Sequence, residues 1–166
     1  MAMKPLDRPD SLHLEAAKGW CELHAFAEAD AELDNITASL RAHPKVLEVR
    51  WQIYANLEKW EGALEIASAL VTMRPDWANG WIYKASSLTE LNRHEEAYET
   101  LSAAAARFPS DEIIPYDLAC VCCALKRLEE ARIWLGKAIE AGGREMKLRA
   151  LDDPDLTPLW QGLREG

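Results

Sequence analysis

The feature that most constrains this 166-residue chain is a repeat of 34 residues. Four alanines mark the repeat, and apolar columns before and after them keep the same spacing through all four units. A period of about 20–50 residues is the signature of a protein built from stacked copies of one small unit. The alanines are Ala29, Ala63, Ala97 and Ala131, and the leucines six residues before them are Leu23, Leu57, Leu91 and Leu125.

Each unit is predicted to hold two helices. Apolar residues recur at intervals of three and four, which is the spacing of an amphipathic helix. Pro44, Pro75 and Pro109 follow the second helix of a unit, where proline cannot continue it. No segment shows sustained apolar–polar alternation, so we expect an all-α fold whose short links make antiparallel hairpins. The expected helices are 11–25, 28–42, 45–57, 60–73, 77–91, 94–108, 111–125 and 128–141.

Both ends of the chain depart from the period. Residues 1–10 are expected to be an extended lead-in, with Asp10 or Ser11 capping the first helix. A solenoid needs a terminal cap, because its last repeat would otherwise expose an apolar face. We assign 144–166 to that cap, with helical turns over 144–151 and a further helix that Asp153 or Asp155 can start. The apolar stripe of that further helix is Leu156, Leu159, Trp160 and Leu163.

Charge and composition narrow the classes of partner. The formal net charge is −9, which argues against nucleic acid, because phosphate binding needs a positive surface. An acidic protein favours partners with a basic face. No apolar segment approaches the roughly 18 residues of a membrane-spanning helix, and the first ten residues do not form a signal peptide. We therefore expect a cytoplasmic protein without a transmembrane segment, with its four cysteines reduced.

The repeat resembles the tetratricopeptide repeat (TPR), whose loose pattern is W-x2-L-G-x2-Y, then A-x3-F-x2-A, then P. The first unit is the most divergent and has Arg41 where the proline would be. The resemblance covers about residues 10–143 and implies a right-handed superhelical solenoid with repeats at about 10–43, 44–77, 78–111 and 112–143. The third unit matches best, through Trp81, Ala85, Leu88, Ala97, Leu101, Ala104 and Pro109.

In TPR proteins the first helix of each repeat lines a concave groove where partners bind as peptides or helices. The family's carboxylate clamp is not carried over, because Leu14, Val49 and Tyr83 stand where polar donors are needed. We expect a partner to bury apolar side chains against Ile82, Ile113 and Tyr116. The predicted groove residues are Lys18, Lys45, Glu48, Gln52, Asn56, Asn79, Ile82, Tyr83, Ser86, Ile113, Tyr116 and Cys120.

No pattern predicts catalysis, a cofactor or a metal. A nucleophilic site needs a base and an orienting carboxylate together, whereas the four histidines fall at different repeat positions. Phosphate-binding glycine motifs are absent from the sequence. Cys120, Cys122 and Cys123 share one predicted helix, but their nearest further candidate ligands, Cys21 and His24, are three repeats away. Free cysteines of this kind are commonly small buried residues.

These observations predict a monomeric, non-catalytic adaptor that binds a protein partner through the groove. Short repeat proteins of this kind include bacterial proteins that resemble kinesin light chain, which makes a bacterial tubulin filament a candidate partner. The alternative function is a thiol- or metal-dependent sensor that uses Cys120, Cys122, Cys123 and Cys21. A self-assembling scaffold is a third hypothesis, because an uncapped N-terminal face could stack on another copy.

Overall fold

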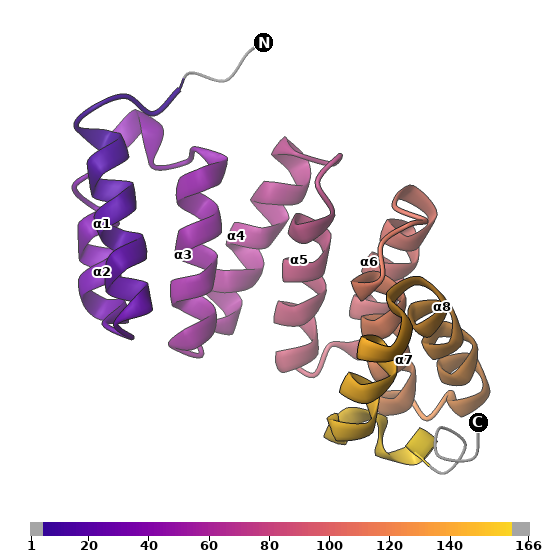
Figure 1. Cartoon of the computed structure of the whole chain (residues 1–166). Helices are drawn as coiled ribbons and strands as arrows, with labels where there is room; N and C mark the ends of the chain where they lie inside the picture. The colour runs from indigo at the N-terminus through magenta and orange to yellow at the C-terminus, as the bar shows by residue number, and fades with distance from the viewer. Residues whose placement is uncertain (1–4, 161–166) are drawn as a thin grey trace. The chain divides into compact units, whose positions relative to one another are not determined.

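A computed structural model describes residues 5–160 as helices joined by short connections (Figure 1). No strand occurs within that range, which confirms the all-α prediction. The first four helical elements are α1 (Asp10–Glu22), α2 (Phe26–Leu33), the 3₁₀ helix η1 (Ala38–Leu40) and α3 (Pro44–Asn56). They are followed by α4 (Trp60–Met73), α5 (Ala78–Glu90), α6 (His94–Arg107), α7 (Ile113–Ala124), α8 (Leu128–Asp152) and the 3₁₀ helix η2 (Pro154–Leu159).

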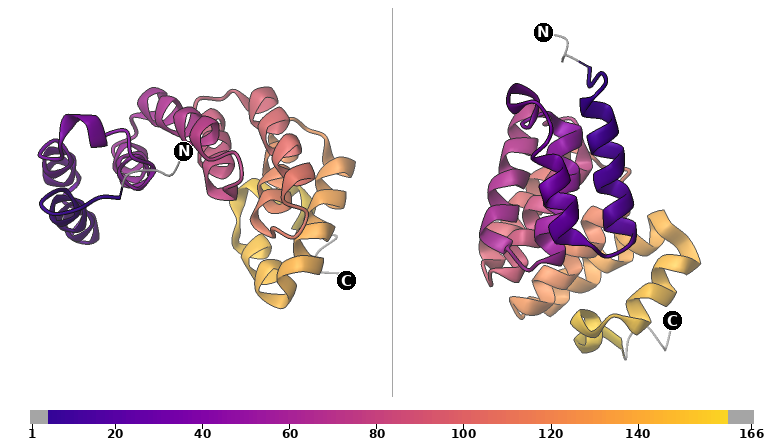
Figure 2. Two further views of the ribbon diagram at one scale, coloured as in Figure 1. Left: turned by 90° about the horizontal axis from the view of Figure 1, so that it is seen from above. Right: turned by 90° about the vertical axis from the view of Figure 1, so that its left-hand side faces the viewer.

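The chain divides into two compact units, Met1–Pro75 (unit 1) and Asp76–Gly166 (unit 2). In unit 1, α1 packs against α2 and α3 against α4, while α2 also contacts α3. In unit 2, α5 packs against α6, α6 against α7, and α7 against α8. Within each unit, consecutive helices run antiparallel side by side in all three views (Figure 2).

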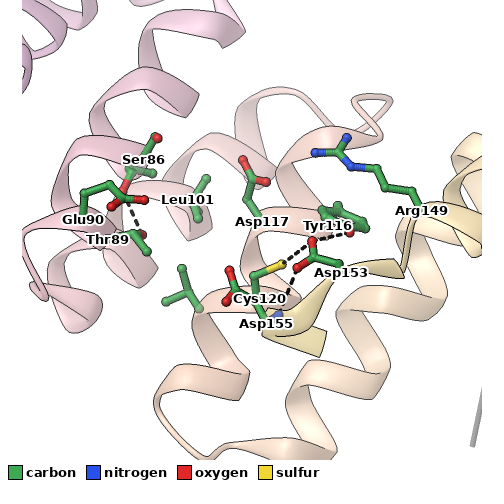
Figure 3. Close-up of a pocket in the computed structure, with 12 residues that line it drawn as sticks. Ser86, Thr89, Glu90, Leu101, Tyr116, Asp117, Cys120, Arg149, Asp153 and Asp155 are labelled. Atoms are coloured by element: carbon green, nitrogen blue, oxygen red, sulfur yellow. Dashed lines mark hydrogen bonds between the residues drawn. The ribbon is translucent and has the colours of Figure 1, made fainter. Parts of the chain in front are cut away.

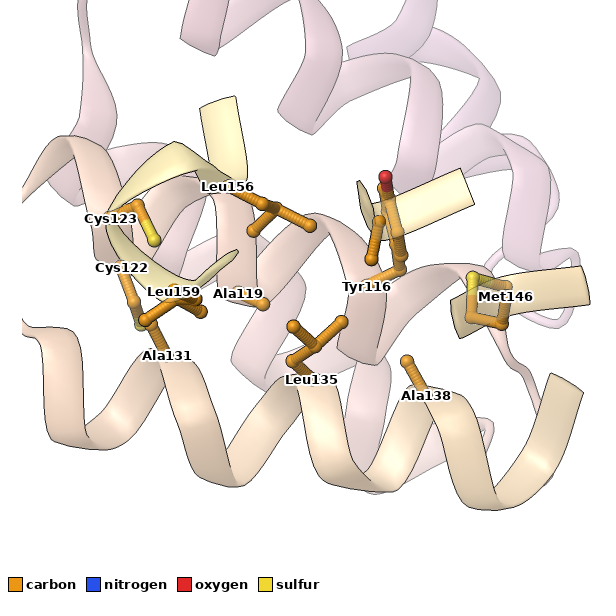
Figure 4. Packing of buried hydrophobic residues seen from close by; sticks show 11 residues of the cluster. Tyr116, Ala119, Cys122, Cys123, Ala131, Leu135, Ala138, Met146, Leu156 and Leu159 are labelled. Atoms are coloured by element: carbon orange, nitrogen blue, oxygen red, sulfur yellow. The ribbon is translucent and has the colours of Figure 1, made fainter. Parts of the chain in front are cut away.

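The columns of the repeat form the cores of the two units. The four alanines that mark the period are completely buried. In unit 1, Ala29 joins a cluster with Leu33, Ile36 and Ile53. In unit 2, Ala131 joins a cluster that contains Ala119, Leu135 and Ala138, with Leu156 and Leu159 of η2 pointing into it (Figure 4).

A left-handed residue ends the first helix of every hairpin. Its φ lies between 55° and 61° at four positions that are again 34 residues apart: His24, Glu58, Asn92 and Lys126. The N–H of the next residue then donates to a carbonyl five residues back, which satisfies an acceptor that a helix end leaves unpaired. These bonds run from Ala25 to Trp20, Lys59 to Tyr54, Arg93 to Leu88 and Arg127 to Cys122, at 2.8–2.9 Å.

The second helix of the first hairpin was predicted too long. Helix α2 ends at Leu33 instead of continuing to residue 42. Arg41 donates from Nε to the carbonyl of Ile36 at 2.8 Å, so the non-helical segment after Leu33 gains a hydrogen-bond partner. The sequence suggested that Asp10 could cap α1. The structure shows no such cap, because Oδ1 of Asp10 accepts the backbone N–H of Thr37 at 2.6 Å.

The C-terminal segment, residues 144–160, folds back on α7. Helix α8 continues across Gly143, whose φ of 64° marks a kink, and ends at Asp152. Asp153 caps η2 by accepting the N–H of Asp155 at 3.0 Å, as one of the two predicted caps. Trp160 donates from Nε1 to the carbonyl of Ala150 at 2.9 Å. The predicted contribution of Leu163 lies outside the described residues.

Glycine at the left-handed position should stabilise unit 1. Glu58→Gly relieves the steric cost that a side chain meets at positive φ, so we expect the free energy of unfolding to rise by about 0.5–1 kcal/mol. The same substitution inside α4, Glu65→Gly, should lower it by about 1 kcal/mol, because glycine is a poor helix residue. Urea unfolding of both variants measures the difference, and a shift of the same sign in both would contradict the account.

Candidate functional site

A cavity of about 220 Å³ opens in unit 2 between α5, α7 and the C-terminal segment (Figure 3). Helix α5 contributes Ser86, Thr89 and Glu90 to its wall. Helix α7 contributes Tyr116, Asp117 and, about one helical turn after both, Cys120. The C-terminal segment supplies Arg149, Asp153 and Asp155. We call this site the acidic cavity.

Negative charge dominates the acidic cavity. Four carboxyl groups line it, from Glu90, Asp117, Asp153 and Asp155, against the single guanidinium group of Arg149. The carboxyl groups come from three separate elements of the fold, so they surround the cavity from different sides (Figure 3). A cavity of one sign with low-dielectric walls attracts ligands of the opposite sign.

Tyr116 anchors the C-terminal segment to α7. Its side chain is 1% exposed, and its hydroxyl donates to Oδ2 of Asp153 at 2.6 Å. The guanidinium group of Arg149 lies over its ring, 4.4 Å from the centroid, at cation–π distance. Burial and this hydrogen bond raise the pKa of the tyrosine, so its hydroxyl stays protonated and keeps donating. The segment after Gly143 is therefore held as one wall of the cavity.

Asp117 lies half-buried in the cavity wall. Within residues 5–160, its carboxyl group has no hydrogen bond or ion pair. Burial raises the pKa of this carboxyl to about 7; Arg149 opposes the rise, while Asp111 and Asp153 add to it. A perturbed carboxyl group in a cavity is a recognised marker of a functional site. Asp117 also lies on the predicted groove face, four residues after Ile113 and three before Cys120.

A second cavity, of about 450 Å³, lies in unit 1 between α1 and α3. It brings together four of the predicted groove residues: Lys18, Lys45, Glu48 and Gln52. Its formal charge is balanced, because its charged lining residues are two lysines and two glutamates: Lys18, Lys45, Glu22 and Glu48. Lys18 is already paired with Glu15 at 2.8 Å. This cavity therefore has no strong charge preference.

The other predicted groove residues do not all line a cavity. Ser86 and Cys120 line the acidic cavity, whereas Asn79, Ile82, Tyr83 and Ile113 line neither of the two cavities. Asn56 is exposed and donates to the carbonyl of Gln52 at 2.8 Å.

Tyr116 departs most from the expected role. We predicted that a partner would pack on its ring, but Arg149 and Asp153 already occupy its surroundings. Neither Asp117 nor Arg149 was predicted from the sequence, and Asp153 and Asp155 were interpreted as helix-capping residues only. The position of Asp117 on the face of Ile113 and Cys120 could have revealed it.

The cysteines lie in surroundings that suppress thiolate formation. Burial raises the pKa of Cys122 and of Cys123 to about 11, and it also raises the pKa of Cys21 and Cys120. The thiolate is the nucleophilic and metal-binding form of cysteine. These thiols therefore lack the lowered pKa that a reactive or metal-binding cysteine needs.

In residues 5–160, no three His, Cys, Asp or Glu side chains lie close enough together to hold a metal ion. No helix in the same range is long and apolar enough to cross a bilayer.

Comparisons with known proteins agree on the fold. MamA from Desulfovibrio magneticus RS-1 superposes with a TM-score of 0.75 at 16% identity, covering 97% of this chain and 96% of that chain. YrrB, a TPR protein with an unusual peptide-binding site, gives a TM-score of 0.71 at 17% identity, covering 87% and 75%. MamA of strain MSR-1 gives 0.69 at 20% identity, covering 80% and 76%.

The chain has the TPR fold. The similarity to solved structures establishes this point and confirms the all-α TPR solenoid that the sequence predicted. No protein-family model matches the sequence, and no curated protein matches it. What the TPR fold of this chain binds has to be argued from its own side chains, because a fold by itself does not specify a ligand.

Removing the charge of Asp117 should stabilise unit 2 above neutral pH. The folded-state pKa of about 7 lies above the usual value of 3.8, so the folded chain holds a proton that the unfolded chain releases between these pH values. The free energy of unfolding of the natural chain should therefore fall as the pH rises from about 4 to 7 and then level off.

Asp117→Asn should lack this decline and be the more stable protein at pH 8. Urea unfolding at a series of pH values measures both curves. Asp152→Asn, an exposed position in the same unit, provides the matched control and should keep the decline. Parallel curves for Asp117→Asn and the natural chain would contradict the assignment.

Proposed function

We propose that this chain is a non-catalytic adaptor that binds an extended segment of a partner protein, with the acidic cavity of unit 2 as its main point of contact. The observation that carries the proposal is the acidic cavity itself. It lies between the first helices of two successive repeats, α5 and α7, which is the face that TPR proteins use for partners. It also contains Asp117, whose carboxyl group has no protein partner within the described residues.

The comparison with YrrB supports a peptide as the ligand. That protein shares the fold and has a peptide-binding site. A peptide suits the acidic cavity, because about 220 Å³ is below the roughly 300–1,000 Å³ of pockets for cofactors and drug-sized ligands. A site of this size receives one side chain, while the exposed surface around it accommodates the backbone on either side.

The neighbouring groove residues extend the proposed contact. Ser86 forms part of the cavity wall, and Ile82 lies one helical turn before it on α5. Both side chains are partly exposed. The cavity of unit 1, lined by Lys18, Lys45, Glu48 and Gln52, is a second candidate contact for a longer partner.

Selection from a displayed peptide library on the intact chain tests the adaptor function. We expect recovered peptides to bind with roughly micromolar affinity, as is common for small interfaces that order a flexible segment. Ser86→Trp, which fills the cavity from α5, should weaken the same peptides at least about tenfold. Glu145→Trp, at an exposed position of α8 outside the cavity, is the matched control and should leave binding unchanged. Failure to recover any binding peptide would reject the proposal.

A bacterial tubulin filament remains a specific prediction for the partner. Co-sedimentation of the intact chain with polymerised bacterial tubulin tests it, and Ser86→Trp should reduce the amount of protein in the pellet if the acidic cavity contacts the filament. Recovery of the chain in the supernatant at every polymer concentration would reject this partner while leaving the adaptor function to the peptide selection.

A further inference from the structure

We infer that the acidic cavity receives the ammonium group of a lysine side chain from the partner protein. This inference rests on the proposed function, because it names the residue type that the same site takes. It goes further by assigning the contact to Asp117 and to the carboxyl groups that face it across the cavity.

The distribution of carboxyl groups fits an ammonium ion. Glu90 reaches the cavity from α5, Asp117 from α7, and Asp153 and Asp155 from the C-terminal segment (Figure 3). A lysine ammonium has three N–H donors arranged around one nitrogen and no acceptor. Carboxyl groups on three elements attract an ammonium group from several sides, and Asp117 can accept from one of its N–H donors.

Asp117 supplies an independent reason to expect a cation. Its carboxyl group is deep enough for burial to be the main cause of its raised pKa, yet no described side chain donates to it. A half-buried carboxyl group without a partner is costlier to keep ionised than one in water. The other acidic group deep in the wall, Asp153, accepts from Tyr116 and from the N–H of Asp155. Asp117 is thus left as an acceptor for a donor that comes from outside the chain.

The walls between the charged groups suit the stem of lysine. Ala85, Leu101 and Val121 line the cavity beside the carboxyl groups. The lysine side chain has a flexible apolar stem that packs along such surfaces and a compact charged end. Anionic ligands are disfavoured, because four carboxyl groups face them against one guanidinium group. Arg149 does not fill the role of the ligand, since its guanidinium group lies over the ring of Tyr116.

Binding should depend on pH through Asp117. The charged groups around it are Glu90 of α5, Asp111 before α7, Arg149 of α8, and Asp153 and Asp155 of the C-terminal segment. Lysine binds the ionised carboxylate, and Asp117 titrates near pH 7, so affinity should rise as the pH increases from 6 to 8. If binding requires the ionised form, the two ends of this range differ by about tenfold.

The first experiment uses n-butylammonium chloride, which reproduces the end of a lysine side chain, and follows the intact chain by NMR. We expect saturable shifts at the amides of Thr89, Asp117 and Cys120, with a dissociation constant that is roughly millimolar at pH 8 and about tenfold weaker at pH 6. Asp117→Asn and Glu90→Gln should each weaken binding, and Asp117→Asn should remove the pH dependence. Glu145→Gln, at an exposed site of α8 outside the cavity, should behave as the natural chain.

1-Butanol, which lacks the charge, should give no saturable shifts in the cavity. Absence of cavity shifts with butylammonium at pH 8, or equal binding by natural chain and Asp117→Asn, would overturn the inference. Because Asp117→Asn is expected to be more stable than the natural chain at that pH, a loss of binding could not be attributed to unfolding.

The second experiment links the cavity to a partner. Peptides recovered by library selection are resynthesised with each lysine replaced by norleucine, which keeps the stem and removes the charge. We expect one replacement to weaken binding about tenfold in the natural chain and to have little effect in Asp117→Asn. Peptides that bind equally well without any lysine would overturn the inference while leaving the adaptor function standing. A selection that yields no peptide would reject the adaptor function itself, and butylammonium binding would still report on the cavity.

Discussion

Close approach of the two helices in each repeat is the constraint on which the rest of this structure depends. In unit 1, Ala17 of α1 and Ala29 of α2 are both fully buried in one cluster; in unit 2, Ala119 of α7 and Ala131 of α8 do the same. A larger side chain at these points would have to displace a neighbouring helix, because protein interiors are close-packed. The turn between the helices must also reverse the chain within a few residues. The left-handed residue at the end of each first helix accomplishes this, and it recurs with the same period.

Because these requirements repeat, the sequence reveals them well. The bounds of α3 to α7 agree with the predicted helices to within two residues. This agreement is expected, because prolines that end helices and the spacing of apolar residues are local features of the sequence. The early end of α2 was not predicted, because the segment after it is held by hydrogen bonds between residues far apart in the sequence. Asp10 accepts the N–H of Thr37, and no local pattern indicates a hydrogen bond across 27 positions. The same limit applies to Tyr116. Its position in the repeat does not indicate that the C-terminal segment covers it.

The candidate site combines both kinds of information. Its α5 and α7 walls follow from the period, which placed Ser86 and Cys120 on the groove face. Its remaining wall comes from Arg149, Asp153 and Asp155, which lie beyond the last repeat. The C-terminal segment therefore has two effects. It covers the apolar face of the last hairpin through Leu156 and Leu159, and it places carboxyl groups opposite Asp117. The chemistry of the cavity could not be predicted from the repeats, because part of it belongs to a segment that does not repeat.

Asp117 connects the stability of unit 2 with the ligand that we infer. Ionising this carboxyl group in its half-buried position weakens the folded state, because water solvates the charge better in the unfolded chain. A lysine ammonium in the cavity replaces part of that lost solvation, so it favours the ionised form and lowers the pKa of the carboxyl. By linkage, a ligand that binds the folded state alone also stabilises it. A basic partner should therefore stabilise unit 2 most above pH 7, where Asp117 of the free protein is ionised and has no partner.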